Sequence, residues 1–195
     1  HSYSNKIQKT MNRMLLLPCL LFTAALYGQL APGTSAPLFQ HLHEVNAEWR
    51  FFDGTVPATP VRFSNDTQRI AQHLNMVREH LAVHAPMGLS AAQTRERKVL
   101  LQTLDVYAHA GRFPQNHVLP YRNPIFIDPA GTACAVGHLM IASGSRALAE
   151  RIDAEMETGY LAEIIADQRF QAPVSEWASA HGFTAEELAW IQPGY

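Results

Sequence analysis

The sequence predicts a mainly α-helical fold: a single globular multi-helix domain with a proline-rich irregular arm and at most a two-stranded β-ribbon. Three observations support this prediction. Apolar residues recur at spacings of three and four along much of the chain, which is typical of amphipathic helices. Two capping boxes mark helix starts, and prolines and glycines leave room only for short strands.

The N-terminal part of this domain is predicted to hold two helices separated by a loop. The segment 38–49 carries apolar residues at helical spacing, and the loop 50–60 is rich in turn-forming residues. A short strand is expected at 61–63. Ser64 or Asn65 then caps the second helix. The apolar face of that helix consists of Ile70, Leu74, Val77 and Leu81.

The third helix has the clearest boundaries. Its N-terminus is predicted by the capping box from Ser90 to Gln93, in which each side chain can bond the backbone N–H of the other residue. Its C-terminus is predicted at Gly111, because glycine adopts the left-handed conformation that ends many helices.

The irregular arm spans 113–129, where four prolines exclude a long helix. The apolar run 125–127 inside it is predicted to be a strand paired with 61–63. Helices are then expected at 132–141, 146–158, 161–170, 174–180 and 185–191. The last begins with a second capping box, Thr184 to Glu187.

Residues 11–29 have the order of features found in a secretory signal peptide. Arg13 supplies the positive start, 14–26 form the apolar run, and Gly28 ends it with a small residue. The run is shorter than the roughly 20 residues that a transmembrane helix needs. We therefore expect an upstream extension and signal peptide at 1–28, a mature domain at 29–195, and export to the periplasm or the extracellular space.

The predicted mature domain is acidic and contains one cysteine. Residues 1–28 hold three of the 15 lysines and arginines and none of the 17 acidic residues, so the mature domain has a net charge of −5. An acidic protein gains nothing from counterion release on a phosphate backbone, which argues against a nucleic-acid partner. Cys19 lies in the signal peptide, so Cys134 has no intramolecular disulfide partner. The sequence predicts no transmembrane span in the mature domain and leaves the partner, a protein or a small molecule, unidentified.

Four residues around the predicted helix at 132–141 are the candidates for catalysis: Cys134, His138, Asp128 and Arg122. A cysteine in the first turn of a helix can have a lowered pKa, and histidine four residues later can exchange a proton with it. The alternative is structural: Cys134 packs as a small apolar residue among alanines, and Asp128 bonds the backbone of a turn.

A metal or haem site is a further possibility. His80 and His84 are four residues apart on one helical face, a spacing at which two imidazoles can bind one ion. Cys134 and His138 have the same spacing but need a third ligand, such as His117 or Asp128. Histidine is also favoured in the last turn of a helix without any ligand. No cofactor is predicted.

Two segments, 122–137 and 188–195, together resemble a pattern found in exported bacterial proteins without an assigned activity. The resemblance covers the C-terminal half of the chain and implies no reaction.

Taken together, these observations predict an exported soluble helical domain with a binding or envelope-associated role and no identifiable catalytic centre. Two alternatives stay open: a hydrolase or transferase that uses Cys134 with a histidine, and a His/Cys metal-binding or haem-binding protein. Whether the protein is an enzyme is therefore undecided at this level.

Overall fold

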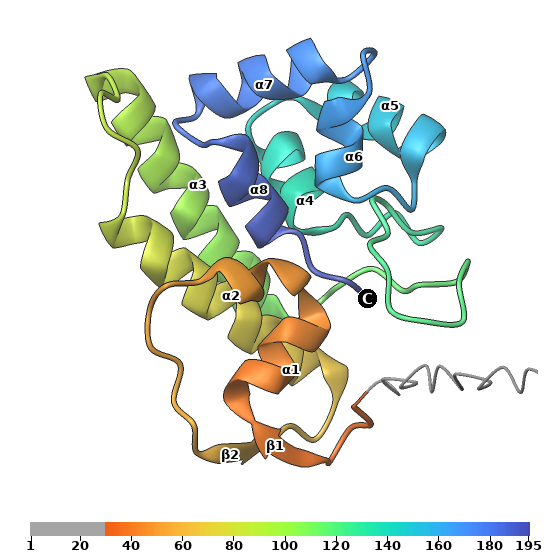
Figure 1. The fold of residues 1–195 in the computed structure, drawn as a ribbon. Coiled ribbons are helices and arrows are strands. Elements are labelled where there is room, and N and C mark those ends of the chain that lie inside the picture. The colour runs from red at the N-terminus through yellow and green to blue at the C-terminus, as the bar shows by residue number, and fades with distance from the viewer. Residues whose placement is uncertain (1–29) are drawn as a thin grey trace, which may run out of the picture.

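The structure is a computed structural model that describes residues 30–195. The predicted signal peptide, including Cys19, lies outside these residues. The described chain is mainly α-helical with one two-stranded ribbon, as the sequence predicts (Figure 1).

The ribbon is formed by β1 (Ser35–Pro37) and β2 (Pro60–Arg62), which run antiparallel with Ser35 opposite Arg62. The predicted pairing of 61–63 with 125–127 is wrong. The backbone of the second segment bonds elsewhere: Phe126 donates its N–H to the carbonyl of Glu157 and accepts the N–H of Cys134. Ile127 forms only an isolated bridge with Ala133.

The predicted helix at 38–49 is divided at Asn46. The chain forms α1 (Leu38–Val45) and then the 3₁₀ helix η1 (Ala47–Phe51), and Asn46 between them is extended, with φ −152° and ψ 119°. The side-chain oxygen of Asn46 accepts the N–H of Glu48 and so caps η1. Its amide group donates to carbonyl groups of the C-terminal segment, at Ala189, Trp190 and Gln192.

The helices α2 (Asp66–Val83) and α3 (Ala91–Ala110) lie side by side as a hairpin (Figure 1). Both begin with the predicted caps: Asn65 accepts the N–H of Gln68, and Ser90 and Gln93 form the capping box. Gly111 ends α3 with a φ of 62°, in the left-handed region that favours glycine.

Five helices make up the C-terminal half. They are α4 (Ala135–Ala142), α5 (Arg146–Met156), α6 (Leu161–Ala166), α7 (Gln171–Ala180) and α8 (Ala185–Ile191). The predicted start of α4 at 132 is three residues early, because 128–133 form a tight turn instead. The capping box of α8 is confirmed.

Helix α8 lies at the centre of the molecule, between the α2–α3 hairpin and the helices α4, α6 and α7 (Figure 1). Its side chains Leu188 and Ile191 are fully buried in the one core cluster, which extends from α1 to α8. The segment after α8 then pairs with the irregular arm, where Tyr195 and Asn123 exchange backbone hydrogen bonds. The C-terminal residues thus join elements from both halves of the chain.

Candidate functional site

The sequence predicted Cys134 in the first turn of a helix. In the structure it lies one position earlier, as the N-cap of α4. Its Sγ accepts the backbone N–H of Gly137 at 3.3 Å, so the thiol takes the place usually held by a serine or threonine oxygen. Its side chain is 0% exposed. Burial raises the pKa of the thiol to about 12, and this effect outweighs the N–H groups of the helix start, which lower it. The thiol is therefore protonated at neutral pH.

Two tyrosine hydroxyls lie close to this helix start. Tyr107 donates to the carbonyl of Ala133 at 2.8 Å, and Tyr195 accepts the N–H of Ala135 at 3.2 Å. The two phenol oxygens are 3.5 Å apart. Burial raises the pKa of both phenols, so neither can act as a base near neutral pH.

The other three catalytic candidates do not converge on the thiol. His138 packs against the ring of Tyr107, with centroids 4.7 Å apart, and burial lowers its pKa. Arg122 donates to the carboxylate of Asp66 at 2.7 Å and to the carbonyl of Gly194 at 2.9 Å. The backbone N–H of His138 donates to the carbonyl of Cys134 at 2.7 Å, as in any helix, but within residues 30–195 no hydrogen bond joins the thiol of Cys134 to the side chain of His138, Asp128 or Arg122.

Asp128 organises the turn before α4. One carboxylate oxygen accepts the N–H groups of Ala130 and Thr132, at 3.0 and 2.8 Å, and the other accepts the N–H of Gln115 at 3.0 Å. A carboxylate with these three backbone partners holds a loop together. The geometry around Cys134 therefore favours packing and capping over nucleophilic catalysis.

His80 and His84 do lie together, at the C-terminal end of α2. Their rings stack with centroids 4.0 Å apart and an interplanar angle of 15°. The Nδ1 of His84 is 2.9 Å from the carbonyl oxygen of His80 and donates to it, so only Nε2 of that ring is left for a ligand. His117, a suggested third ligand for Cys134 and His138, pairs instead with Glu157 at 3.3 Å. Across the described chain, no group of three or more His, Cys, Asp or Glu side chains could hold a metal ion.

The histidine pair lines a pocket of about 230 Å³ between η1, the end of α2 and α8. Three aromatic rings give this pocket its shape. The ring of Phe52 lies 5.5 Å from that of Trp190 and 5.3 Å from that of His80, and Trp190 and His80 are 5.1 Å apart. We call this the aromatic pocket; its lining residues are Glu48, Phe51, Phe52, Asp53, His80, Leu81, His84, Glu186, Glu187 and Trp190.

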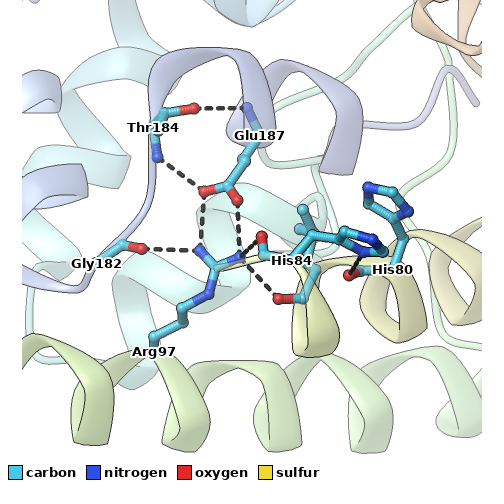
Figure 2. Close-up of polar contacts among 7 residues, drawn as sticks. His80, His84, Arg97, Gly182, Thr184 and Glu187 are labelled. Atoms are coloured by element: carbon cyan, nitrogen blue, oxygen red, sulfur yellow. Dashed lines mark hydrogen bonds and ion pairs between the residues drawn. The ribbon is translucent and has the colours of Figure 1, made fainter. Parts of the chain in front are cut away.

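One wall of the aromatic pocket is fixed by a buried ion pair (Figure 2). Arg97 of α3 donates to both carboxylate oxygens of Glu187, at 2.8 and 2.7 Å. The same guanidinium donates to the carbonyls of Gly182 and Leu81, both at 2.8 Å. The end of α2, helix α3 and the start of α8 are thereby held in a fixed arrangement around the pocket.

The pocket is negatively charged at neutral pH. Burial and the neighbouring His84 both lower the pKa of His80, so that ring is neutral. Arg97 neutralises Glu187, and Arg50 lies 3.8 Å from Glu48. Two further lining carboxylates, Asp53 and Glu186, have no ion-pair partner among the described residues.

The sequence singled out the two histidines but missed the aromatic rings that line this pocket and the arginine that binds the lining residue Glu187. Phe52 follows η1, whereas Trp190 is in α8, and only the docking of α8 brings the two rings together. No local spacing in the sequence signals such a contact. The sequence shows only that Phe52 and Trp190 each lie near the end of a predicted helix, which does not indicate that their rings meet.

The chain was compared with protein-family models, with curated proteins and with solved structures, and none of them matches. Residues 30–195 form no helix with the length and apolar character needed to cross a bilayer.

Proposed function

We propose that this protein is an exported binding protein without a catalytic centre, and that the aromatic pocket is its ligand site. The observation that carries the proposal is the contrast between the two candidate regions. The thiol region is sealed, with Cys134 fully buried. The aromatic pocket is open to solvent and is lined by Phe52, Trp190 and the histidine pair.

The composition of the pocket supports a binding role. Ligand sites are concave, carry apolar and aromatic walls, and hold a small number of polar groups that orient the ligand. The aromatic pocket has these features, and the Arg97–Glu187 pair gives it a rigid frame. Partly exposed aromatic rings gathered in one hollow are unusual on a protein surface that binds nothing.

Export is the second part of the proposal, and it rests on the predicted signal peptide. N-terminal sequencing of the protein recovered from its native host should find Gln29 as the first residue. Retention of Met11 or Met14 would contradict export through this signal.

Ligand binding is tested with a library of small soluble fragments and two-dimensional NMR. Binders should shift the indole N–H resonance of Trp190 and leave that of Trp177, which lies outside the pocket, unchanged. Phe52→Ala should weaken these binders. Phe39→Ala is the matched control, because Phe39 is another partly exposed phenylalanine (40%) and does not line the pocket. A library in which no member shifts Trp190 would contradict the proposed site.

A further inference from the structure

The aromatic pocket combines two features that attract the same kind of ligand. Aromatic rings carry negative charge on their faces and therefore bind cations. Phe51, Phe52 and Trp190 line the pocket, together with four carboxylates. Because the carboxylates surround apolar ring surfaces, a ligand that matches both must carry positive charge on an apolar body.

The charged residues in and near the pocket also favour a positively charged ligand. The lining residues include no lysine or arginine. The two nearby arginines are engaged: Arg97 with Glu187, and Arg50 with Glu48. Asp53 and Glu186 stay uncompensated among the described residues, so a cation entering the pocket meets about two net negative charges, each attractive at short range.

The rim already shows a cation on an aromatic ring. The guanidinium carbon of Arg50 lies 4.5 Å from the ring centroid of Phe51, over its face. Phe51 is 69% exposed, so this contact is made at the edge of the pocket rather than in the core. Inside the pocket, the rings of Phe52 and Trp190 are tilted by 36° to one another.

The size of the pocket limits the ligand. A volume of about 230 Å³ is below the range of about 300–1,000 Å³ that is typical of sites for drug-sized molecules. A hydrated divalent metal ion would satisfy the carboxylates but leave the rings without a partner, and the described residues offer no three-ligand metal cluster. A compact organic cation satisfies both groups.

From these observations, and on the basis of the binding function proposed above, we infer that the aromatic pocket binds a small organic cation of the quaternary or alkylated ammonium class. The cation would lie against Phe52 and Trp190, with Asp53 and Glu186 supplying the opposite charge.

The experiment compares two probes of nearly identical shape, choline and 3,3-dimethyl-1-butanol, in which a neutral carbon replaces the ammonium nitrogen. NMR titration of the full chain follows the indole N–H of Trp190, with Trp177 as internal reference. We expect choline to bind at least about ten-fold more tightly than the neutral probe, because only choline gains from the rings and the carboxylates. Asp53→Asn and Glu186→Gln should each weaken choline by about three-fold. Glu176→Gln, an exposed glutamate on α7 outside the pocket, should leave choline binding unchanged.

Each other outcome decides against the inference in a different way. Equal binding of the two probes would overturn the choice of a cation and leave the proposed binding function intact. Failure of both probes, with Zn²⁺ shifting the imidazole resonances of His80 and His84, would overturn it in favour of a metal site. If neither probe, nor Zn²⁺, nor any library fragment shifts a pocket resonance, the inference and the proposed function both fail.

Discussion

Arg97 and Glu187, 90 residues apart in sequence, form a two-pronged ion pair that is almost completely shielded from solvent, with side-chain exposures of 4% and 13%. The pair joins the α2–α3 hairpin to α8. Removing one charge from such a pair leaves the other buried without compensation, which is costly.

Glu187→Gln should therefore lower the free energy of unfolding by about 2–4 kcal/mol. Glutamine can still accept the N–H of Thr184 in the capping box, so the substitution isolates the charge from the cap. Glu186→Gln is the matched control at the neighbouring, exposed position and should change stability by less than about 0.5 kcal/mol. Urea denaturation of both variants measures the difference, and equal stabilities would contradict the importance of the pair.

His73 makes the fold sensitive to acid. Its Nδ1 accepts the indole N–H of Trp49 at 2.8 Å, and its Nε2 faces the carbonyls of Ile191 and Trp190 without a hydrogen bond of good geometry. Complete burial lowers the pKa of His73 from 6.5 to about 3. Protonation of His73 would add an N–H at Nδ1. That group would face the indole N–H of Trp49, and the hydrogen bond between the two side chains would be lost.

Because this pKa is lower in the folded state, the stabilising contribution of neutral His73 is complete above pH 6.5 and is lost as the pH falls toward 3. At about 1.4 kcal/mol per pKa unit, the loss amounts to as much as about 5 kcal/mol. Chemical denaturation at a series of pH values should show a shallower loss for His73→Gln than for the parent chain. His109→Gln, at an exposed position, should keep the parental slope.

Cys134 should react slowly with thiol reagents in the folded protein. With a pKa of about 12, only about one thiol in 10⁵ is ionised at pH 7, and the side chain is fully buried. Labelling with a chromogenic disulfide should be slow in buffer and fast in urea, and His138→Ala should leave the native rate unchanged. Rapid stoichiometric labelling, slowed by His138→Ala, would revive the hydrolase hypothesis.

Tyr195→Phe should destabilise the fold by about 1–2 kcal/mol, because the N–H of Ala135 at the start of α4 then loses its acceptor in a buried site. Tyr121→Phe removes a hydroxyl from a tyrosine that is 56% exposed and should be almost neutral. Thermal unfolding followed by circular dichroism measures both effects. Equal melting temperatures for the two variants would show that the hydroxyl of Tyr195 contributes little.

The features predicted well are those with local causes. The capping boxes at Ser90 and Thr184 and the left-handed Gly111 each depend on residues within one helical turn, so the sequence alone identifies them. The break at Asn46 could not be predicted in this way, because the side chain bonds carbonyls more than 140 residues away. The predicted strand pairing was wrong for the same reason: a strand's partner is chosen by the whole fold.

In the candidate site, too, local features could be predicted from the sequence and long-range contacts could not. The spacing of His80 and His84 was visible in the sequence and does place their rings together. The lining of their pocket by Phe52 and Trp190 depends on where α8 docks. For Cys134 the sequence left capping, packing and catalysis open. Its complete burial in the core cluster could be learned only from the structure, because the residues of that cluster come from helices throughout the chain.

The three hydrogen bonds from Asn46 to Ala189, Trp190 and Gln192 also impose an order on biosynthesis. A ribosome makes α8 after every other described helix, so Asn46 lacks these three partners until almost the whole described chain has emerged. Closing a contact over such a separation also costs chain entropy. The contacts of α8 with η1 and α2 therefore become possible only after those that join α1, α2 and α3.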